Sequence, residues 1–529
     1  MGDRDFFGSE IARVGIRPQP ETIFSTSDVD LTTKFQIRGM TRIVLLSKLF
    51  LSWLSRFDTW ASEEMKPFRS IVMDRRFEVR KQEMLAECEV SPQVFRGAQK
   101  RMEKFVQPFA NLLRLSAQRE HAADYVSGLV SDLDRKNVES IAYRHDQDRR
   151  NLQHFIGSAE WNHQPLFTEL ARQAGREIGE SDGVIVFDPS AFPKKGKQSV
   201  GVARQWCGRL GKLDNCQVAV YMGYVTRSDH VLVNTRLYLP EEWTRDRKRM
   251  KAAGVPKGIR FQTRHAQALE MLDEQGHLLP HAWVAGDDEM GRNSAFRRDL
   301  NDRNEQYLLA VPSNTSVRDL EATPPPYGGR GSDPKTPFVQ AHQWRDEVDA
   351  DQWTRIKVRD AEKGPLEIEI VACRVQTKIK RRMMQYDEML VIIRSLDEEG
   401  VTKYDYYLSN APSDTPLKEF ARVALAENRV EEAIKRGKSE AGLADYEVRN
   451  WRGWHHHQVL SLMATWFLAS ETRRGKKIHS GDHCTTNPGW PCDATESRLR
   501  MRHTNEDCPE QNPPIDPKRR STLLSLQST

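Results

Sequence analysis

Short apolar runs bounded by glycine or proline recur through the middle of the chain and predict core strands. The run at 184–187 leads directly into Asp188, and the run at 283–285 leads through a glycine into Asp287. Alternating apolar and polar positions predict further strands, and apolar positions at helical spacing predict helices between them. The strands are expected at 217–225, 230–239 and 307–311, and the helices at 263–275 and 294–303. This alternation predicts an α/β core.

Two other patterns flank that core. From 76 to 173 the chain is rich in helix formers, and its apolar residues recur at helical spacing, which predicts short helices with a packed core. Beyond a stretch rich in proline and glycine at 323–337, strands are expected at 354–358, 366–375, 388–394 and 405–408. A helix at 416–440 carries Glu431, and an apolar helix at 459–468 is expected to pack back on the core.

These patterns divide the chain into segments. We expect an N-terminal extension at 1–72, a helical segment suited to DNA binding at 73–175 and the first part of the core at 176–315. A linker with a β-rich insertion follows at 316–412, the last part of the core at 413–470 and a polar, basic tail at 471–529.

The composition narrows the class of protein. With 29% charged and 38% hydrophobic residues in 529, the chain has the composition of a soluble globular protein of several folding units. Its most apolar stretch, at 43–54, is too short to cross a bilayer, and no signal-peptide pattern follows Met1, so we expect a cytoplasmic protein without membrane attachment. The seven cysteines are scattered, which favours free thiols.

The net charge of +5 is small, but the basic residues are clustered. Three clusters contain at most one acid each, which favours a polyanion such as DNA, because lysine and arginine gain affinity by releasing counterions from phosphates. The clusters are Lys194, Lys195, Lys197, Arg204, Arg209 and Lys212; then Arg245, Arg247, Lys248, Arg249 and Lys251; then Arg374, Lys378, Lys380, Arg381 and Arg382.

Three acids stand where a metal site would need them. Asp188 and Asp287 each follow a predicted strand, and Glu431 lies on a predicted helix. Carboxylate oxygen is the ligand that Mg²⁺ prefers, and such a set suits phosphodiester chemistry. The pattern leaves alternatives open: Asp288 or Glu289 for the second acid, and Glu432 for the third.

Histidines and cysteines elsewhere give weaker signals. The run His455–His457 is expected to be solvated or to face DNA, since adjacent helical residues point in different directions. His483, Cys484, Cys492, His503 and Cys508 lack the spacing of a zinc site.

Three separated segments carry a family resemblance. They are VFDPSAFPKKGKQSVGVARQWCGRLGKLDNCQ, then WVAGDDEMGRNSAFRRDL followed by YLLAVPSNT, then ENRVEEAIKRGKSEAGLADYEVRNWRGWHHH. In this order and with compatible gaps, they resemble the DDE transposases of bacterial insertion sequences, in the branch of insertion-sequence family 701, which is related to family 4. The resemblance covers roughly residues 73–469.

The resemblance implies an RNase H-like catalytic core interrupted by a β-strand insertion and preceded by a helical N-terminal domain. It implies that Asp188, Asp287 and Glu431 hold two Mg²⁺ (or Mn²⁺) ions. It also implies that Lys438 contacts a phosphate and that Arg429 contacts the DNA backbone. The first basic cluster, by its charge, adds five expected DNA-binding residues: Lys194, Lys195, Lys197, Arg204 and Arg209. Ala424 and Glu427 depart from the family 4 signature, which has tyrosine and arginine there.

The function expected from this resemblance is cut-and-paste DNA transposition. The protein would bind the terminal inverted repeats of its element and catalyse Mg²⁺-dependent strand cleavage and strand transfer into target DNA. A homodimer is expected in the synaptic complex, with the protein associated with the bacterial nucleoid. The alternative is a remnant that binds the terminal repeats without cleaving them.

Overall fold

The structure is a computed structural model that describes residues 96–329, 332–361, 364–378, 386–396 and 400–483. The expected extension at 1–72 and most of the expected tail lie outside the described residues. The chain divides into two compact units, Met1–Thr472 and Arg473–Thr529. The features discussed below belong to the first unit.

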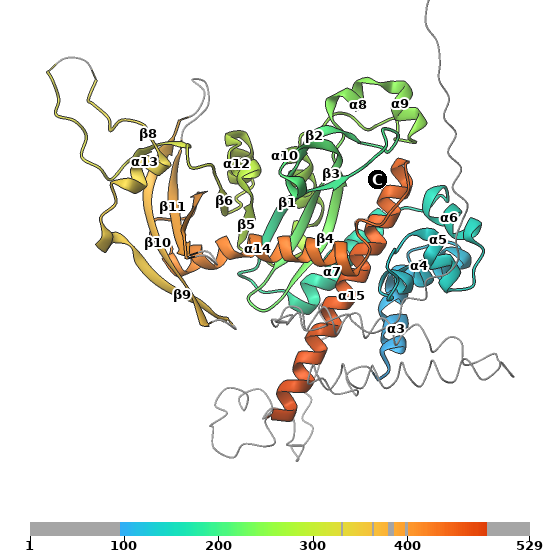
Figure 1. The fold of residues 1–529 in the computed structure, drawn as a ribbon. Helices are drawn as coiled ribbons and strands as arrows, with labels where there is room; N and C mark the ends of the chain where they lie inside the picture. The colour runs from blue at the N-terminus through green and yellow to red at the C-terminus, as the bar shows by residue number, and fades with distance from the viewer. Residues whose placement is uncertain (1–95, 330–331, 362–363, 379–385, 397–399, 484–529) are drawn as a thin grey trace, which may run out of the picture. The chain divides into compact units, whose positions relative to one another are not determined.

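A mixed sheet of 12 strands organises the described residues (Figure 1). The strands run in the order β2-β3-β1-β5-β6-β12-β11-β10-β7-β8, with β4 paired to β3 and β9 paired to β10. Their bounds are β1 (Val184–Pro193), β2 (Ala203–Cys207), β3 (Lys212–Val225), β4 (His230–Leu237), β5 (Trp283–Gly286), β6 (Tyr307–Ala310), β7 (Ser316–Asp319), β8 (Val339–Gln340), β9 (Thr354–Ala361), β10 (Gly364–Thr377), β11 (Asp387–Leu396) and β12 (Thr402–Ser409).

The helices lie before, between and after these strands. They are α3 (Ala98–Ala110), α4 (Ser116–Leu129), α5 (Val138–Arg144), α6 (Arg149–Gly157), α7 (Gln164–Ile178), α8 (Glu241–Arg245), α9 (Arg247–Ala252), α10 (Arg264–Gln275), α11 (Asp288–Gly291), α12 (Ser294–Asn301), α13 (Ala341–Asp346), α14 (Leu417–Glu440) and α15 (Trp451–His483). The expected mixed α/β fold is confirmed. Within the described residues, no helix combines the length and the apolar character needed to cross a membrane.

The β-rich segment expected as an insertion extends the sheet of the core. Strand β3 pairs antiparallel with β1 on one side and with β4 on the other, while β5 and β6 run parallel to β1. Strand β12 then pairs antiparallel with β6, and β11 and β10 follow. The hydrogen-bonded ladder therefore continues from the core into the inserted strands without a break.

A buried polar network joins these two parts. The Glu388 carboxylate of β11 accepts hydrogen bonds from Arg297 Nε (2.7 Å), Tyr307 OH (2.7 Å) and Thr377 Oγ1 (2.9 Å). Arg297 and Glu388 are both almost fully buried. Removing one partner would leave the other charge buried and unpaired, at a cost of roughly 3–5 kcal/mol.

Helix α14 crosses the sheet and contacts strands of both parts (Figure 1). Its apolar positions, among them Phe420, Val423, Val430 and Ile434, repeat at helical spacing and are buried on the sheet. Near the start of the helix, Trp283 Nε1 on β5 donates to the Glu419 carboxylate (3.0 Å). This bond and the buried face set the position of α14 over β1 and β5.

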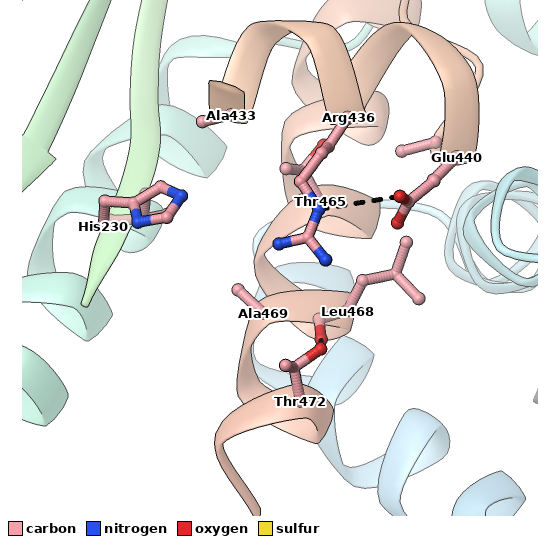
Figure 2. Close-up of a pocket in the computed structure, with 10 residues that line it drawn as sticks. His230, Ala433, Arg436, Glu440, Thr465, Leu468, Ala469 and Thr472 are labelled. Atoms are coloured by element: carbon pink, nitrogen blue, oxygen red, sulfur yellow. Dashed lines mark hydrogen bonds and ion pairs between the residues drawn. The ribbon is translucent and has the colours of Figure 1, made fainter. Parts of the chain in front are cut away.

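The C-terminal part of α14 meets α15 and the start of β4. Figure 2 shows a small cavity at this junction, about 30 Å³ in volume, which has room for only one or two waters. Arg436 Nε and Glu440 Oε1, one helical turn apart on α14, lie 3.6 Å from each other beside it. The tight junction holds α14 from behind.

The run His455–His457 is buried, so the expectation that it is solvated or faces DNA is wrong. The two ring nitrogens of His456 lie 2.9 and 3.0 Å from the carbonyl oxygens of Ile156 and Trp161, and the Trp161 ring stacks on the imidazole. His457 Nδ1 lies 2.9 Å from Tyr125 OH. The run can be buried because α15 is surrounded here, so each imidazole meets a different neighbour from the N-terminal helices and the core.

Burial lowers the pKa values of these histidines, to about 3 for His455 and His457 and about 4 for His456. The unfolded chain takes up these protons near pH 6.5, whereas the folded chain does not. The contribution of these neutral histidines to the free energy of unfolding is therefore fully present above about pH 6.5. It is lost as the pH falls toward 4.

We predict that the free energy of unfolding, measured by urea titration, falls between pH 7 and pH 5. His456→Gln should reduce this pH dependence, because glutamine keeps a polar hydrogen-bond donor at this position and takes up no proton. His277→Gln, at an exposed histidine, is the control and should leave the pH dependence unchanged. Equal pH dependence in the two variants would contradict the prediction.

Candidate active site

Two acids meet where the ladder between two neighbouring parallel strands ends. Strand β1 itself continues past Asp188 to Pro193, beyond the apolar run from which the strand was predicted. In the ladder between β1 and β5, Phe187 pairs with Gly286, so Asp188 and Asp287 are the next residues on each strand. Strand β1 and strand β5 are parallel, so both side chains emerge at the same edge of their ladder. Asp287 also caps the short helix α11, accepting a hydrogen bond from Met290 N–H (3.1 Å).

Helix α14 brings the third acid to this point. Val430 is buried against Gly223 of β3, where a Cβ atom would lie only 2.5 Å from Val430 Cγ2. Gly223 also adjoins an irregularity in the pairing of β3 with β4. The missing side chain lets α14 approach the strand closely, and the next residue, Glu431, remains exposed at the edge of that contact.

Asp188, Asp287 and Glu431 line one cleft of about 1250 Å³. Six carboxylates and four cationic side chains line it, so its charge is negative before any ligand enters. They are Asp188, Asp287, Asp288, Glu289, Glu431 and Asp445, with Arg264, Arg292, Lys435 and Lys438. The structure thus brings the three predicted acids together, and it places Lys438 in the same cleft.

Arginines neutralise the alternative candidates for the second acid. Asp288 pairs with Arg292, and Glu289 pairs with Arg264 at 2.6 Å. By contrast, Asp287 has no ion pair within the described part of the chain. Glu432, the alternative on α14, is not among the residues that line the cleft. These contacts favour Asp287 and Glu431 over their neighbours.

The environment of the acids favours their protonated forms. Burial raises the pKa of Asp188 well above its usual range, and the charges of Asp287 and Glu431 raise it further, whereas Lys438 opposes the shift. Burial also raises the pKa of Asp287 to about 7, against the hydrogen bond from Met290. Negative charge held this close is costly, and a bound cation or proton relieves the cost.

The chemistry of the three side chains fits a hard divalent cation. They offer only oxygen ligands, and neither Asp188 nor Glu431 forms an ion pair or side-chain hydrogen bond with another described residue. As they stand, no three acidic, histidine or cysteine side chains in the described ranges are arranged so that they could hold a metal ion. The charge and the ligand type of the three acids therefore suit a metal ion, although their side chains are not close enough together to coordinate one ion in this arrangement.

The structure adds a fourth acid, Glu427, to the group formed by Asp188, Asp287 and Glu431, a role that the sequence analysis did not predict. Glu427 lies one turn before Glu431 on α14, and burial raises its pKa to about 8, helped by the charges of Asp287, Asp188 and Glu431. The four-residue spacing from Glu431 was the available signal, because residues four apart share a helix face. An acid thus stands near the centre where family 4 has arginine.

Lys438 reaches the centre from two turns beyond Glu431. Its Nζ donates to Ser190 Oγ (2.8 Å), two residues past Asp188, and lies 4.7 Å from the centroid of the Phe192 ring. Lys435 is exposed and lines the same cleft. Both cations are therefore close enough to the acids to meet a phosphate in the cleft.

Arg429 lies outside the cleft lining. Its guanidinium donates to the carbonyl oxygens of Thr226 (2.6 Å) and Arg227 (3.0 Å), at the turn between β3 and β4. These contacts anchor α14 to the sheet. A contact between Arg429 and DNA stays a prediction.

The first basic cluster divides into anchored and exposed members. The Lys194 ammonium lies 3.5 Å from the centroid of the Tyr446 ring, and burial lowers its pKa to about 8. Lys195, Lys197 and Arg204 are exposed. The side chain of Arg209 and residues Lys380, Arg381 and Arg382 lie outside the described part of the chain.

Comparison with known proteins agrees with this geometry. Residues 108–365 match the family described as DDE superfamily endonuclease. This match covers just under half of the chain. The matched stretch contains Asp188 and Asp287 and ends before Glu431.

A relative carries a name that points to transposition. The probable transposase for insertion sequence element IS701 from Microchaete diplosiphon is 30% identical over 203 residues, which are 36% of this chain and 49% of that protein. The aligned part of the chain thus spans about half the length of this relative.

We predict that Gly223→Ala destabilises the fold by roughly 1–3 kcal/mol, because the new methyl group collides with the stiff Val430 side chain. Val430→Ala should also destabilise alone, by opening a cavity. The double variant should recover part of the combined loss, as measured by urea unfolding. Gly196→Ala, where a Cβ meets nothing within 4 Å, is the control. Equal stability of the Gly223 and Gly196 variants would show that the close contact does not position α14.

Proposed function

We propose that the protein is a transposase that binds the terminal inverted repeats of an insertion sequence and catalyses metal-dependent strand cleavage and strand transfer. The observation that carries this proposal is the meeting of Asp188, Asp287 and Glu431 in one cleft. The match of residues 108–365 to the family described as DDE superfamily endonuclease and the similarity to a probable transposase support it.

The strand order supports an RNase H-like core. The five strands β4-β3-β1-β5-β6 lie side by side, the first three antiparallel and the last two parallel to β1. In this arrangement Asp188 of β1 and Asp287 after β5 meet where the ladder between the two strands ends, and α14 adds the third acid from the face of the sheet. The inserted strands β7–β12 lie between the second and the third acid in the sequence.

The roles of the side chains follow from their chemistry. When bound, Mg²⁺ or Mn²⁺ ions would activate the attacking oxygen and stabilise the leaving oxygen. Asp188, Asp287 and Glu431 would hold these ions. Lys438 and Lys435 would offset the charge of the phosphate through charge-assisted hydrogen bonds. The cleft would admit the element end and the target DNA in turn, in a homodimeric complex that joins two ends.

The second candidate is a DNA-binding remnant that no longer cleaves. Glu427 and Ala424, at positions where family 4 has arginine and tyrosine, favour it. The intact set of three acids in one cleft favours an active enzyme. Cleavage of the element ends distinguishes the two.

We predict that Asp188→Asn, Asp287→Asn and Glu431→Gln each abolish Mg²⁺-dependent cleavage of labelled DNA that carries the element end. These changes keep the size of each side chain and remove its charge, so binding of the end should persist in a gel-shift assay. Asp288→Asn is the control, because Arg292 already neutralises Asp288. If Asp288→Asn abolishes cleavage and Asp287→Asn does not, the second acid is Asp288. A wild-type protein that binds the ends without cleaving them would favour the remnant.

We further predict that Lys438→Ala lowers cleavage and affinity for the element end together. A charge-assisted contact with a phosphate is worth roughly 1.5–3 kcal/mol, so a loss on the order of tenfold to a hundredfold is expected. Lys435→Ala is the matched comparison on the same helix and should cost less. A larger loss for Lys435→Ala would move the phosphate contact to Lys435, and urea unfolding checks that neither change affects the fold.

A further inference from the structure

An exposed apolar pair lies on the hairpin of β2 and β3. Trp206 and Leu213 are directly opposite each other in the ladder, and 58% of each side chain is exposed. Leu210, in the turn between the strands, is 43% exposed. A large aromatic side chain left this open on a hairpin is costly in water, which points to a ligand that covers it.

Trp206, the aromatic member of the pair, lines the cleft that holds the acids. Trp206 and Gly208 line the same cleft as Asp188, Asp287 and Glu431. A molecule whose reacting group lies at the acids can therefore extend onto the Trp206 ring. The pair belongs to the surroundings of this site and is not an isolated surface feature.

The hairpin holds Trp206 firmly. Cys207 and Cys216 are buried beneath it, and Gln205 Nε2 donates to the Cys216 carbonyl oxygen (3.0 Å). On the same residue, Gln205 Oε1 accepts from Arg264 Nη2 (3.4 Å), which ties β2 to α10. The indole thus projects from a packed strand, which suits a fixed stacking surface.

The charges around the pair identify the type of ligand. Arg204 lies two residues before Trp206 on the same exposed face of β2, and the exposed Lys435 lines the cleft. Lys212 lies next to Asp214 at 3.3 Å and is partly neutralised. An apolar ring beside exposed positive charge suits a nucleotide, whose base stacks and whose phosphate pairs with arginine.

We propose that Trp206 is a stacking surface for an unpaired base at the end of the DNA strand that enters the cleft. Leu213 supports the base from the neighbouring strand, and Arg204 contacts the adjacent phosphate. A base inside a duplex is covered on both faces, so the base on Trp206 is one that has left the stack at a frayed or opened end. This inference rests on the proposed function, because it requires DNA at the acids.

The test uses the full chain and two DNA probes that differ only at one end. One is fully paired, and the other carries unpaired terminal nucleotides with 2-aminopurine among them, whose fluorescence is quenched by stacking. For the wild type we expect quenching and tighter binding of the unpaired probe. Trp206→Ala should remove the quenching and weaken binding of this probe by roughly 5-fold to 100-fold, with the paired probe little changed. Trp206→Phe should keep part of both effects.

Tyr327→Ala provides the matched control, since this aromatic residue is 54% exposed, lies outside the segment expected to bind DNA and does not line the cleft. It should leave both signals intact, and urea unfolding should show that no variant loses its fold. Unchanged quenching in Trp206→Ala would overturn the inference. So would a result in which Trp206→Ala and Leu213→Ala reduce only the molecular mass seen by light scattering, because the pair would then be an interface between two copies of the chain.

The result of the stacking test can be told apart from the result of the cleavage test for the proposed function. Quenching that depends on Trp206 in a protein that never cleaves DNA would retain the stacking surface and reject the transposase activity. If cleavage depends on Asp188 but the Trp206→Ala variant quenches normally, the transposase activity is retained and the stacking surface is rejected. Absence of DNA binding by the wild type would reject both.

Discussion

The parallel pairing of β1 with β5 is the constraint on which the site depends. It places Asp188 and Asp287 next to each other, since the last paired residues, Phe187 and Gly286, immediately precede them. A shift of one residue in this register would turn one carboxylate to the other face of the sheet. The apolar side chains of both strands are fully or nearly fully buried, and this burial opposes such a shift. The core thereby supplies the stability that brings two like charges together.

Holding these carboxylates together has an energetic cost, which is reflected in their pKa values. Asp188, Asp287 and Glu427 all have raised pKa values, with burial as the largest cause in each case. Nearby acids that would add to the cost are paired with arginines: Asp288 with Arg292 and Glu289 with Arg264. The contrast between paired and unpaired carboxylates marks the point where positive charge from a ligand would be most stabilising.

Contacts far from the cleft also hold the acids in place. Helix α14 rests on Gly223 in front and on α15 behind, and the buried imidazoles of α15 join it to the N-terminal helices. The network around Glu388 fastens the inserted strands to the core. The position of Glu431 therefore depends on packing contributed by segments distant in the sequence.

The sequence by itself indicated the apolar runs that lead into Asp188 and Asp287, the helix that carries Glu431 and strands β9 to β12 of the inserted segment, because hydrophobic periodicity is local. It also indicated Lys438, whose seven-residue spacing from Glu431 places both on one helix face. It did not indicate the short strands β2, β7 and β8 or the continuation of β1 to Pro193. Only the tertiary structure decided the burial of His455–His457, the anchoring of Lys194 on Tyr446, and the place of Glu427 and Trp206 beside the acids. A side chain's partners depend on segments brought together by folding, and no local pattern records which segments these are. For that reason the same residue types that predict a solvated or basic surface can become core contacts, and a hairpin residue without any motif can line the site.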